Sequence, residues 1–385
     1  MIKKAVILFS IFSVCLALLA PVLVRAQTGP SVTGSSAEAE YPFLLHFNLS
    51  AESQEDITDI RLNFRLERDS YARVTTEVFI EFQPDATVDI SWTWDMRRTG
   101  GLPPGAGLEF WWTVKDVSGN VIKTTPESIQ FDDNRHDWQS LTEGKITIFW
   151  YEGGLSFAED LMSVTGVAME RLTAETGAFL KKAVKLYIYA NSDDLRGAMI
   201  FPQDWTGGVA YSDYGIIAIG IEPNNLTWGE RVIAHELTHL VIHQMTNNPY
   251  TGLPTWLSEG LAMYNEGEIS RGFTDSLDKA ISEDSLISVR SLSSPFSAFA
   301  DEAILSYAQS HNVVEYLVKT YGQEKMLALL NTFSRGSGYD AALESVYGFD
   351  MDDLNTLWQD YAITNYRESG TDAAWLETAQ RETTE

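Results

Sequence analysis

Two histidines and a glutamate occur together in the stretch Ile233–Val241, in the pattern H-E-x-x-H. His235 and His239 are four residues apart, so on a helix their imidazoles lie one turn apart on the same face, close enough to bind one metal ion. Glu236 lies between them, where its carboxylate can reach a water molecule on that ion. The pattern therefore predicts a metal site that activates water.

Zinc is the metal we expect, because it binds imidazole nitrogen and carboxylate oxygen, and a hydrolytic zinc site keeps three protein ligands and one open position. The third ligand must come from another element. Glu259 is the best choice, because it lies in the run Pro254–Ala262 after a turn at 247–252, which can bring a second helix back against the first. The alternative, an ordinary buried helix with two histidines, does not explain this second run.

The composition is that of a folded and strongly acidic protein. The 385 residues include 27 Lys and Arg and 54 Asp and Glu, a net charge of −27. This length is enough for two domains with a sizeable core. A strongly negative surface repels nucleic acid and anionic membranes, so we expect no nucleic-acid partner. We interpret the acidity as a solvated surface rather than as a recognition site.

The N-terminus has the pattern of a secretory signal peptide at residues 1–26. A basic pair is followed by an apolar run at 5–20, and Val24-Arg25-Ala26 predicts cleavage after Ala26. The alternative is an uncleaved anchor, since residues 5–24 are long enough to span a bilayer. We expect cleavage, a secreted, extracellular or cell-envelope location, and no stable membrane insertion afterwards. The only cysteine, Cys15, lies in the signal, which excludes disulfides from the mature chain.

The first part of the mature chain predicts a β-domain. Residues 27–38 are rich in Ser, Gly and Thr, and we expect a flexible linker there. Apolar and polar residues alternate through 39–133, which predicts an antiparallel β-sandwich that resembles an immunoglobulin or fibronectin type III domain. The fibronectin-like form fits better, because no cysteine pair is present. We interpret the tryptophans as core residues rather than a carbohydrate site, with Trp111 as the one exposed candidate.

A charged hinge at 132–137 marks the boundary to a second domain at 140–367, followed by a disordered tail at 368–385. Strands and one helix are predicted before the metal helix, and helices after Glu259, which makes the fold class α+β. The predicted strands are 145–151, 184–189, 208–211 and 216–221, and the predicted helix is 157–175. An exposed strand near the metal could hold an extended peptide through backbone hydrogen bonds.

The two metal motifs resemble those of the gluzincin metallopeptidases. Trp256–Ala262 is similar to the third-ligand segment of aminopeptidase-N-type enzymes, while His-Glu-Leu-Thr-His, the preceding hairpin and Ser306–Ser310 resemble the peptidase MA-like domain family. The resemblance covers residues 145–365 and implies a zincin-like metallopeptidase domain with a small β-sheet, a helical C-terminal half, bound Zn²⁺ and a peptide or protein substrate. Nineteen residues separate His239 from Glu259, one more than in aminopeptidases, so exopeptidase specificity is not carried over. Thermolysin-like enzymes have an acidic residue four positions after the glutamate ligand, where it supports a histidine. This chain has Met263 at that position.

The expected reaction is peptide-bond hydrolysis by a zinc-activated water, with Glu236 as general base. The resemblance places a helix near the site that carries Tyr307, which we predict to stabilise the oxyanion, although a packing role for this tyrosine is equally consistent with the sequence. His311, one turn further on, is a weaker choice. His243 is rejected as a ligand, because it lies eight residues from His235, about 12 Å along the helix.

Two other functions stay open. A secreted adhesion or binding protein could keep an idle or structural metal site, although the intact glutamate of the H-E-x-x-H pattern argues against it. An aminopeptidase would need an acidic anchor for a free amine, and no motif for one precedes the metal helix. The substrate, the choice between endo- and exo-cleavage and the oligomeric state do not follow from the sequence.

Overall fold

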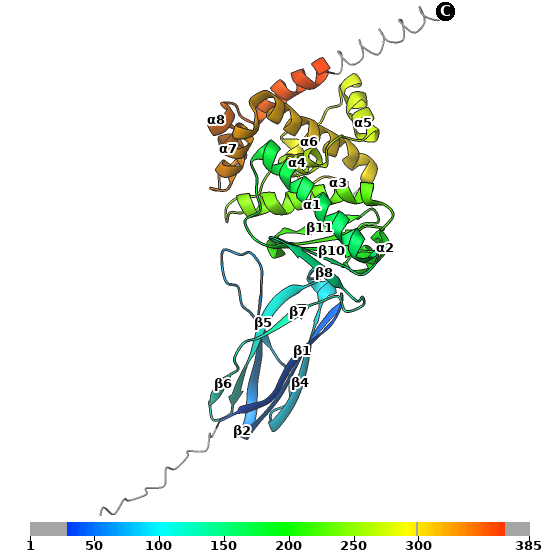
Figure 1. Ribbon diagram of the computed structural model, residues 1–385. Helices are drawn as coiled ribbons and strands as arrows, with labels where there is room; N and C mark the ends of the chain where they lie inside the picture. Colours follow the sequence, from blue (N-terminus) through cyan, green and yellow to red (C-terminus); the bar gives the residue numbers. More distant parts are fainter. Residues whose placement is uncertain (1–28, 298, 366–385) are drawn as a thin grey trace, which may run out of the picture.

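The computed structural model describes residues 29–297 and 299–365 (Figure 1). The predicted signal peptide and the tail at 368–385 lie outside these residues. An N-terminal β-domain is followed by a domain in which helices cover a second sheet. The predicted order, with strands first and a helical C-terminal half, is therefore confirmed. In the described part of the chain, no helix has the length and apolar character that crossing a membrane requires.

The N-terminal domain is a seven-stranded sheet in which all pairs are antiparallel, as the alternating pattern predicts. Its central strand, β2, changes partners along its length: the first half pairs with β1 and β4, and the second half with β3 and β5. The sheet is continuous through β2, so the assignment to an immunoglobulin or fibronectin type stays a prediction. The strands are β1 (Ser31–Glu40), β2 (Leu44–Leu66), β3 (Thr76–Phe79), β4 (Asp85–Asp95), β5 (Ala106–Asp116), β6 (Val121–Lys123) and β7 (Glu127–Phe131).

The predicted flexible linker at 27–38 is wrong over most of its length. Strand β1 occupies Ser31–Glu40 and pairs along the first half of β2. The composition misled the interpretation because a strand can be held mainly by backbone hydrogen bonds, which are independent of side-chain type. Only Val32, Ala37 and Ala39 of this strand pack against the core.

The predicted exposure of Trp111 is also wrong. Its ring is buried, with the guanidinium of Arg65 at 5.3 Å and the ammonium of Lys123 at 4.9 Å from the ring centroid. Strand β5 is buried on both faces, so the alternation does not identify an exposed side there. Long cationic side chains cover the second face and explain the burial of this out-of-phase tryptophan.

The second domain contains a five-stranded sheet in the order β11-β12-β10-β9-β8. Strands β9, β10 and β12 are parallel, while β11 and β8 pair antiparallel at the two edges. The predicted strands and the helix between them are confirmed, and β8 is an additional strand. The elements are β8 (Gln139–Glu143), β9 (Ile146–Trp150), α1 (Gly154–Thr176), β10 (Val184–Tyr189), α2 (Ser192–Gly197), β11 (Gly208–Tyr211) and β12 (Ile216–Gly220).

The helical half follows the sheet and covers one of its faces (Figure 1). It consists of α3 (Leu226–Thr246), α4 (Thr255–Glu266), α5 (Arg271–Ser282), α6 (Ala300–Tyr321), α7 (Gln323–Phe333), α8 (Tyr339–Tyr347) and a helical segment at 351–365. Strand residues such as Leu186 and Ile188 pack into the core beneath these helices.

The opposite face of the same sheet packs against the N-terminal domain. Tyr187 and Tyr189, which alternate with Leu186 and Ile188, belong to the core of that domain together with strands β2 and β5. A sheet that is covered on both faces needs apolar residues at successive positions, which explains the uninterrupted apolar run at 216–219. The N-terminal domain is therefore one of the two layers that enclose this sheet.

The predicted hinge at 132–137 is exposed over most of its length but is anchored at one buried residue. Asp133 is buried, forms a 2.6 Å ion pair with Arg135 and accepts a 2.9 Å hydrogen bond from the hydroxyl of Tyr189. The hydroxyl of Tyr41 donates to the carbonyl of Ala198 across the same boundary. The charges of Asp133 and Arg135 thus have partners and anchor the segment, whereas Asp132 and Asp137 are exposed, as a charged sequence predicts.

Gly260 allows α4 to approach α6 closely next to the predicted metal ligand. A Cβ at this position would lie 2.4 Å from the backbone oxygen of Ser310. We expect Gly260→Ala to lower the free energy of unfolding by about 2 kcal/mol, because the two helices must move apart. Gly166→Ala in α1 is the matched control, since a Cβ there meets nothing and should stabilise the helix by about 0.5–1 kcal/mol. Denaturant unfolding measures both, and a neutral Gly260→Ala would contradict the role of the close contact.

Candidate metal centre and active site

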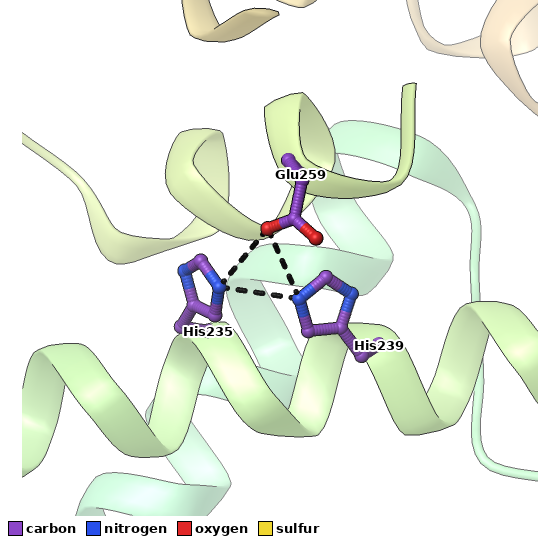
Figure 2. A group of neighbouring side chains, drawn as sticks. All are labelled: His235, His239 and Glu259. Carbon is purple, nitrogen blue, oxygen red and sulfur yellow. Dashed lines mark hydrogen bonds and ion pairs between the residues drawn. The ribbon is translucent and has the colours of Figure 1, made fainter. Parts of the chain in front are cut away.

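Helix α3 places the two predicted histidines side by side. The Nε2 atoms of His235 and His239 lie 3.1 Å apart and point to the same side of the helix (Figure 2). The flanking residues Ile233, Leu237 and Leu240 are fully buried, so the helix is held firmly against the domain core. This burial fixes the direction of both imidazoles, which a metal site requires.

Glu259 approaches the same point from α4. Its Oε2 atom lies 3.5 Å from the Nε2 atom of each histidine (Figure 2). These three side chains form the one group of metal-ligand type found among the described residues. The structure thus brings Glu259 to the two histidines from a second helix, where the sequence predicted it, and its role as a metal ligand stays a prediction.

The other nitrogen of each imidazole has its own partner. His235 Nδ1 lies 2.8 Å from Glu266 Oε1, and His239 Nδ1 lies 3.1 Å from Ser258 Oγ. Glu266 is held in turn by Arg231, at 3.2 Å. A histidine that donates from Nδ1 presents its Nε2 lone pair, so both rings are oriented to ligate a cation between them. Two imidazole nitrogens and one carboxylate oxygen are a donor set that fits zinc.

Sequence reasoning missed Glu266. It looked for an acidic residue four positions after Glu259 and found Met263, which is buried in the structure. Glu266 is seven positions after Glu259, two helical turns along the same face, so it reaches the same histidine from further along α4. An acidic residue at this heptad spacing is a signal that could have identified it.

The electrostatics of the three groups favour a positive charge at their centre. Burial lowers the pKa of His235, but its hydrogen bonds to Glu259 and Glu266 outweigh burial and raise the pKa to about 10. Burial raises the pKa of Glu259, but the neighbouring charges of His239 and His235 outweigh it and hold the pKa well below its usual value. The carboxylates therefore attract a proton or a cation to the imidazoles.

Glu236 faces strand β11, outside the three-residue group. Its carboxylate accepts a hydrogen bond from the backbone N–H of Ala210, and burial together with the nearby charge of Glu259 raises its pKa. The strand approaches so closely that a Cβ on Gly208 would lie 3.1 Å from the side chain of Glu236. The carboxylate is therefore positioned between the edge strand and the metal-ligand group.

A cavity of about 750 Å³ opens beside these groups, and its lining includes His235, Glu236, His239 and Glu259. Tyr307 of α6 also lines it, and burial and the charge of Glu259 raise the pKa of this tyrosine. The structure thus places Tyr307 at the site, as predicted. Its ring also packs against that of Phe296, with the two ring centroids 5.1 Å apart.

The two remaining histidines of this region lie elsewhere. His311 is buried on α6, with its ring 5.9 Å from that of Tyr264, and is absent from the lining of the 750 Å³ cavity. His243 does line that cavity, and its Nε2 lies 3.2 Å from Asp213 Oδ1. His243 is outside the group of three that could hold a metal.

Two histidines from one helix and a glutamate from the next define a gluzincin-like metallopeptidase domain. The sequence matches the family model of the Peptidase MA superfamily over residues 164–364, more than half of the chain, and the chain belongs to this superfamily. The family resemblance seen in the sequence is therefore confirmed, and the domain is that of a peptidase. No curated protein matches the sequence.

Several solved structures share a distant likeness with the chain. An M1 zinc metallopeptidase from Deinococcus radiodurans is 14% identical, with a TM-score of 0.38 over 86% of this chain and 94% of that one. An aminopeptidase A from Legionella pneumophila is 11% identical, with a TM-score of 0.40 over 86% of this chain and 50% of that one. OgpA from Akkermansia muciniphila, solved with an O-glycopeptide, is 9% identical, with a TM-score of 0.21 over 28% of this chain and 30% of that one.

Proposed function

We propose that this protein is a zinc-dependent peptidase that hydrolyses peptide bonds. His235, His239 and Glu259 hold the metal, and Glu236 is the general base. The observation that carries the proposal is the convergence of three ligand atoms on one point, with the carboxylate of Glu236 beside them at the same cavity. Glu236 borders an open cavity, whereas a site that only stabilises the fold would be closed by its ligands.

The reaction adds water across the scissile bond. Zinc, when bound, would polarise the substrate carbonyl and make water acidic enough to attack near neutral pH. Glu236 accepts a proton from that water as the water oxygen bonds to the carbonyl carbon. The same carboxylate then delivers the proton to the amine nitrogen as the carbon–nitrogen bond breaks. The N–H of Ala210 holds the carboxylate in place during both transfers.

Two further elements serve the substrate. Strand β11 is the end strand of its sheet and borders the cavity, so its backbone can pair with an extended peptide. Tyr307 lies across the cavity and donates its hydroxyl proton in a hydrogen bond to the oxyanion that forms at the carbonyl. Its pKa is raised, so the hydroxyl keeps that proton at neutral pH.

The location of the protein is part of the same proposal. Residues 1–26 direct the chain out of the cytoplasm and are removed after Ala26, which leaves a secreted or cell-envelope enzyme. The N-terminal domain is a fibronectin-like module by its strand pattern. Sequencing the N-terminus of the protein isolated from the producing cell tests the cleavage position.

Removal and return of the metal test the proposed function. We expect the purified protein to contain about one zinc per chain, because residues 29–297 and 299–365 contain one complete ligand set. A chelator should abolish cleavage of an unfolded protein such as casein, and added zinc should restore it. Elemental analysis and a fluorogenic cleavage assay measure the two quantities. Equal cleavage by the metal-free protein would contradict the proposal.

Glu266 should influence how tightly the metal binds. We expect Glu266→Gln to weaken zinc binding by about 10–100-fold, because it loses the anionic partner that orients His235 and raises its basicity. Competition with a chromogenic chelator measures the affinity. Glu344→Gln, an exposed change on α8, is the control and should bind zinc as the wild type does. The same affinity in both variants would exclude a supporting role for Glu266.

A further inference from the structure

A second cavity, of about 520 Å³, meets the catalytic groups from the other end of the site. His235, Glu236 and Tyr307 line both this cavity and the larger one, so the catalytic groups stand between the two. The larger cavity extends along the C-terminal half of α3, past His239 and His243, whereas the second extends towards the start of the same helix.

The walls of the second cavity are mostly apolar. They come from four helices and strand β11 of the peptidase domain, and from the loop that leads into β11. The apolar side chains that form them include Trp228 and Val232 of α3, Met263 of α4, Phe273 of α5, Ile304 of α6 and Val209 of β11. Among the described residues that line it there is no lysine or arginine, and its acidic residues, Glu236 and Glu266, are engaged at the metal centre.

Two glycines, Gly207 and Gly208, form the part of the cavity wall that packs against α3. A Cβ on Gly207 would lie 2.7 Å from Trp228, and a Cβ on Gly208 would lie 2.8 Å from Val232. The absence of side chains at these two positions lets the strand approach the helix while the cavity remains beside the catalytic glutamate. The loop before them carries Phe201, which is 77% exposed and has a φ of 53°, an uncommon conformation for a bulky residue.

The larger cavity has a different chemistry. Its walls away from the metal include Ser212, His243, Thr246 and the two asparagines Asn247 and Asn248. Ile242, Tyr250 and Leu253 also line it. A peptide that crosses the catalytic groups would therefore meet a mixed polar and apolar wall on one side of the scissile bond and a mostly apolar wall on the other. Neither lining contains a lysine or arginine among the described residues, so neither offers a cation for the carboxylate of a chain end.

From this asymmetry we infer a substrate class: peptides with a large apolar side chain directly beside the scissile bond, which enters the cavity lined by Val232, Met263 and Ile304. The inference rests on the proposed function, since it assigns the cavity to a substrate of that reaction. Because both cavities continue away from the catalytic groups, the site accepts residues on both sides of the bond. The enzyme is thus an endopeptidase that selects leucine, methionine, phenylalanine or similar residues at one flanking position.

A peptide library with the zinc-loaded protein tests the inference. Each of the two positions beside the cleaved bond is varied, and the products are identified by mass spectrometry. We expect one position to prefer leucine, methionine and phenylalanine over alanine, aspartate and lysine by about tenfold or more, because only these side chains fill an apolar pocket. Cleavage within the peptides, rather than release of single terminal residues, is expected in the same experiment.

Ile304 offers a change of specificity that a misfolded variant could not imitate. Ile304→Asp places a carboxylate in the apolar wall and should shift the preference at that position to lysine and arginine. Ile304→Leu should keep the original preference, and so should Leu357→Asp, an exposed change far along the chain. An unchanged preference in Ile304→Asp, or cleavage by the wild type without any preference, would overturn the assignment of the cavity and leave the proposed peptidase function intact.

A binding measurement separates the two proposals. Fluorescein-labelled peptides that differ only in leucine or alanine at the selected position are titrated with the Glu236→Gln variant, and anisotropy is recorded. We expect about tenfold tighter binding of the leucine peptide. Equal binding overturns the apolar pocket whether or not cleavage is seen. If the wild type cleaves nothing but the variant still prefers leucine, the pocket stands and the proposed function fails.

Discussion

Glu236→Gln is expected to reduce kcat/KM for peptide cleavage by about 10²–10⁴-fold while zinc remains bound. The amide has nearly the same shape as the carboxylate but cannot accept a proton from water. Glu236 is outside the group of three ligand atoms, so the metal should keep its full set of protein donors. The prediction separates a group that moves protons from one that holds the metal.

The measurement combines steady-state kinetics with the zinc content of the same sample. Glu230→Gln is a matched control, because Glu230 is exposed on the same helix and lines neither of the two cavities. It should retain the activity of the wild type. If Glu236→Gln cleaves as fast as Glu230→Gln, hydrolysis by this centre is excluded, and a binding protein with an idle metal becomes the better interpretation.

Without the N-terminal domain, the peptidase domain is expected to aggregate rather than remain soluble. A chain that begins at residue 139 would expose the face of the sheet on which Tyr187, Tyr189, Ile216 and Ala218 are now almost completely buried. An apolar surface of this kind is an aggregation site. Val209 and Tyr211 of β11 also pack against that core, so the strand that holds Glu236 would lose its support.

Size-exclusion chromatography and binding of a hydrophobic dye measure this effect. The control is a chain that begins at residue 29 and keeps both domains, which should be monodisperse and bind little dye. Co-expression of residues 29–138 with residues 139–365 should recover part of the soluble protein, since the buried Asp133 and its partners can re-form the boundary. A well-dispersed and active fragment at 139–365 would show that the interface is dispensable.

The metal ligands could be predicted because their geometry is largely local. The four-residue spacing of His235 and His239 determines their relation on any helix, and only the return of α4 had to be assumed. The strands of the second sheet were predicted for a similar reason, since their apolar runs are short and bounded by turn residues. β1 was misassigned because its backbone pairing depends on a partner strand elsewhere in the sequence, and Trp111 because its burial depends on side chains from other strands.

The sequence by itself determined which atoms could bind a metal and which carboxylate stands beside them, because helical periodicity converts spacing into direction. Only the tertiary structure decided that Glu266 supports His235 and that the N-terminal domain covers one face of the five-stranded sheet. It also decided that an apolar cavity lies beside His235 and Glu236. These features arise where four or more elements meet, and the positions of elements relative to one another depend on packing that no single stretch of chain contains.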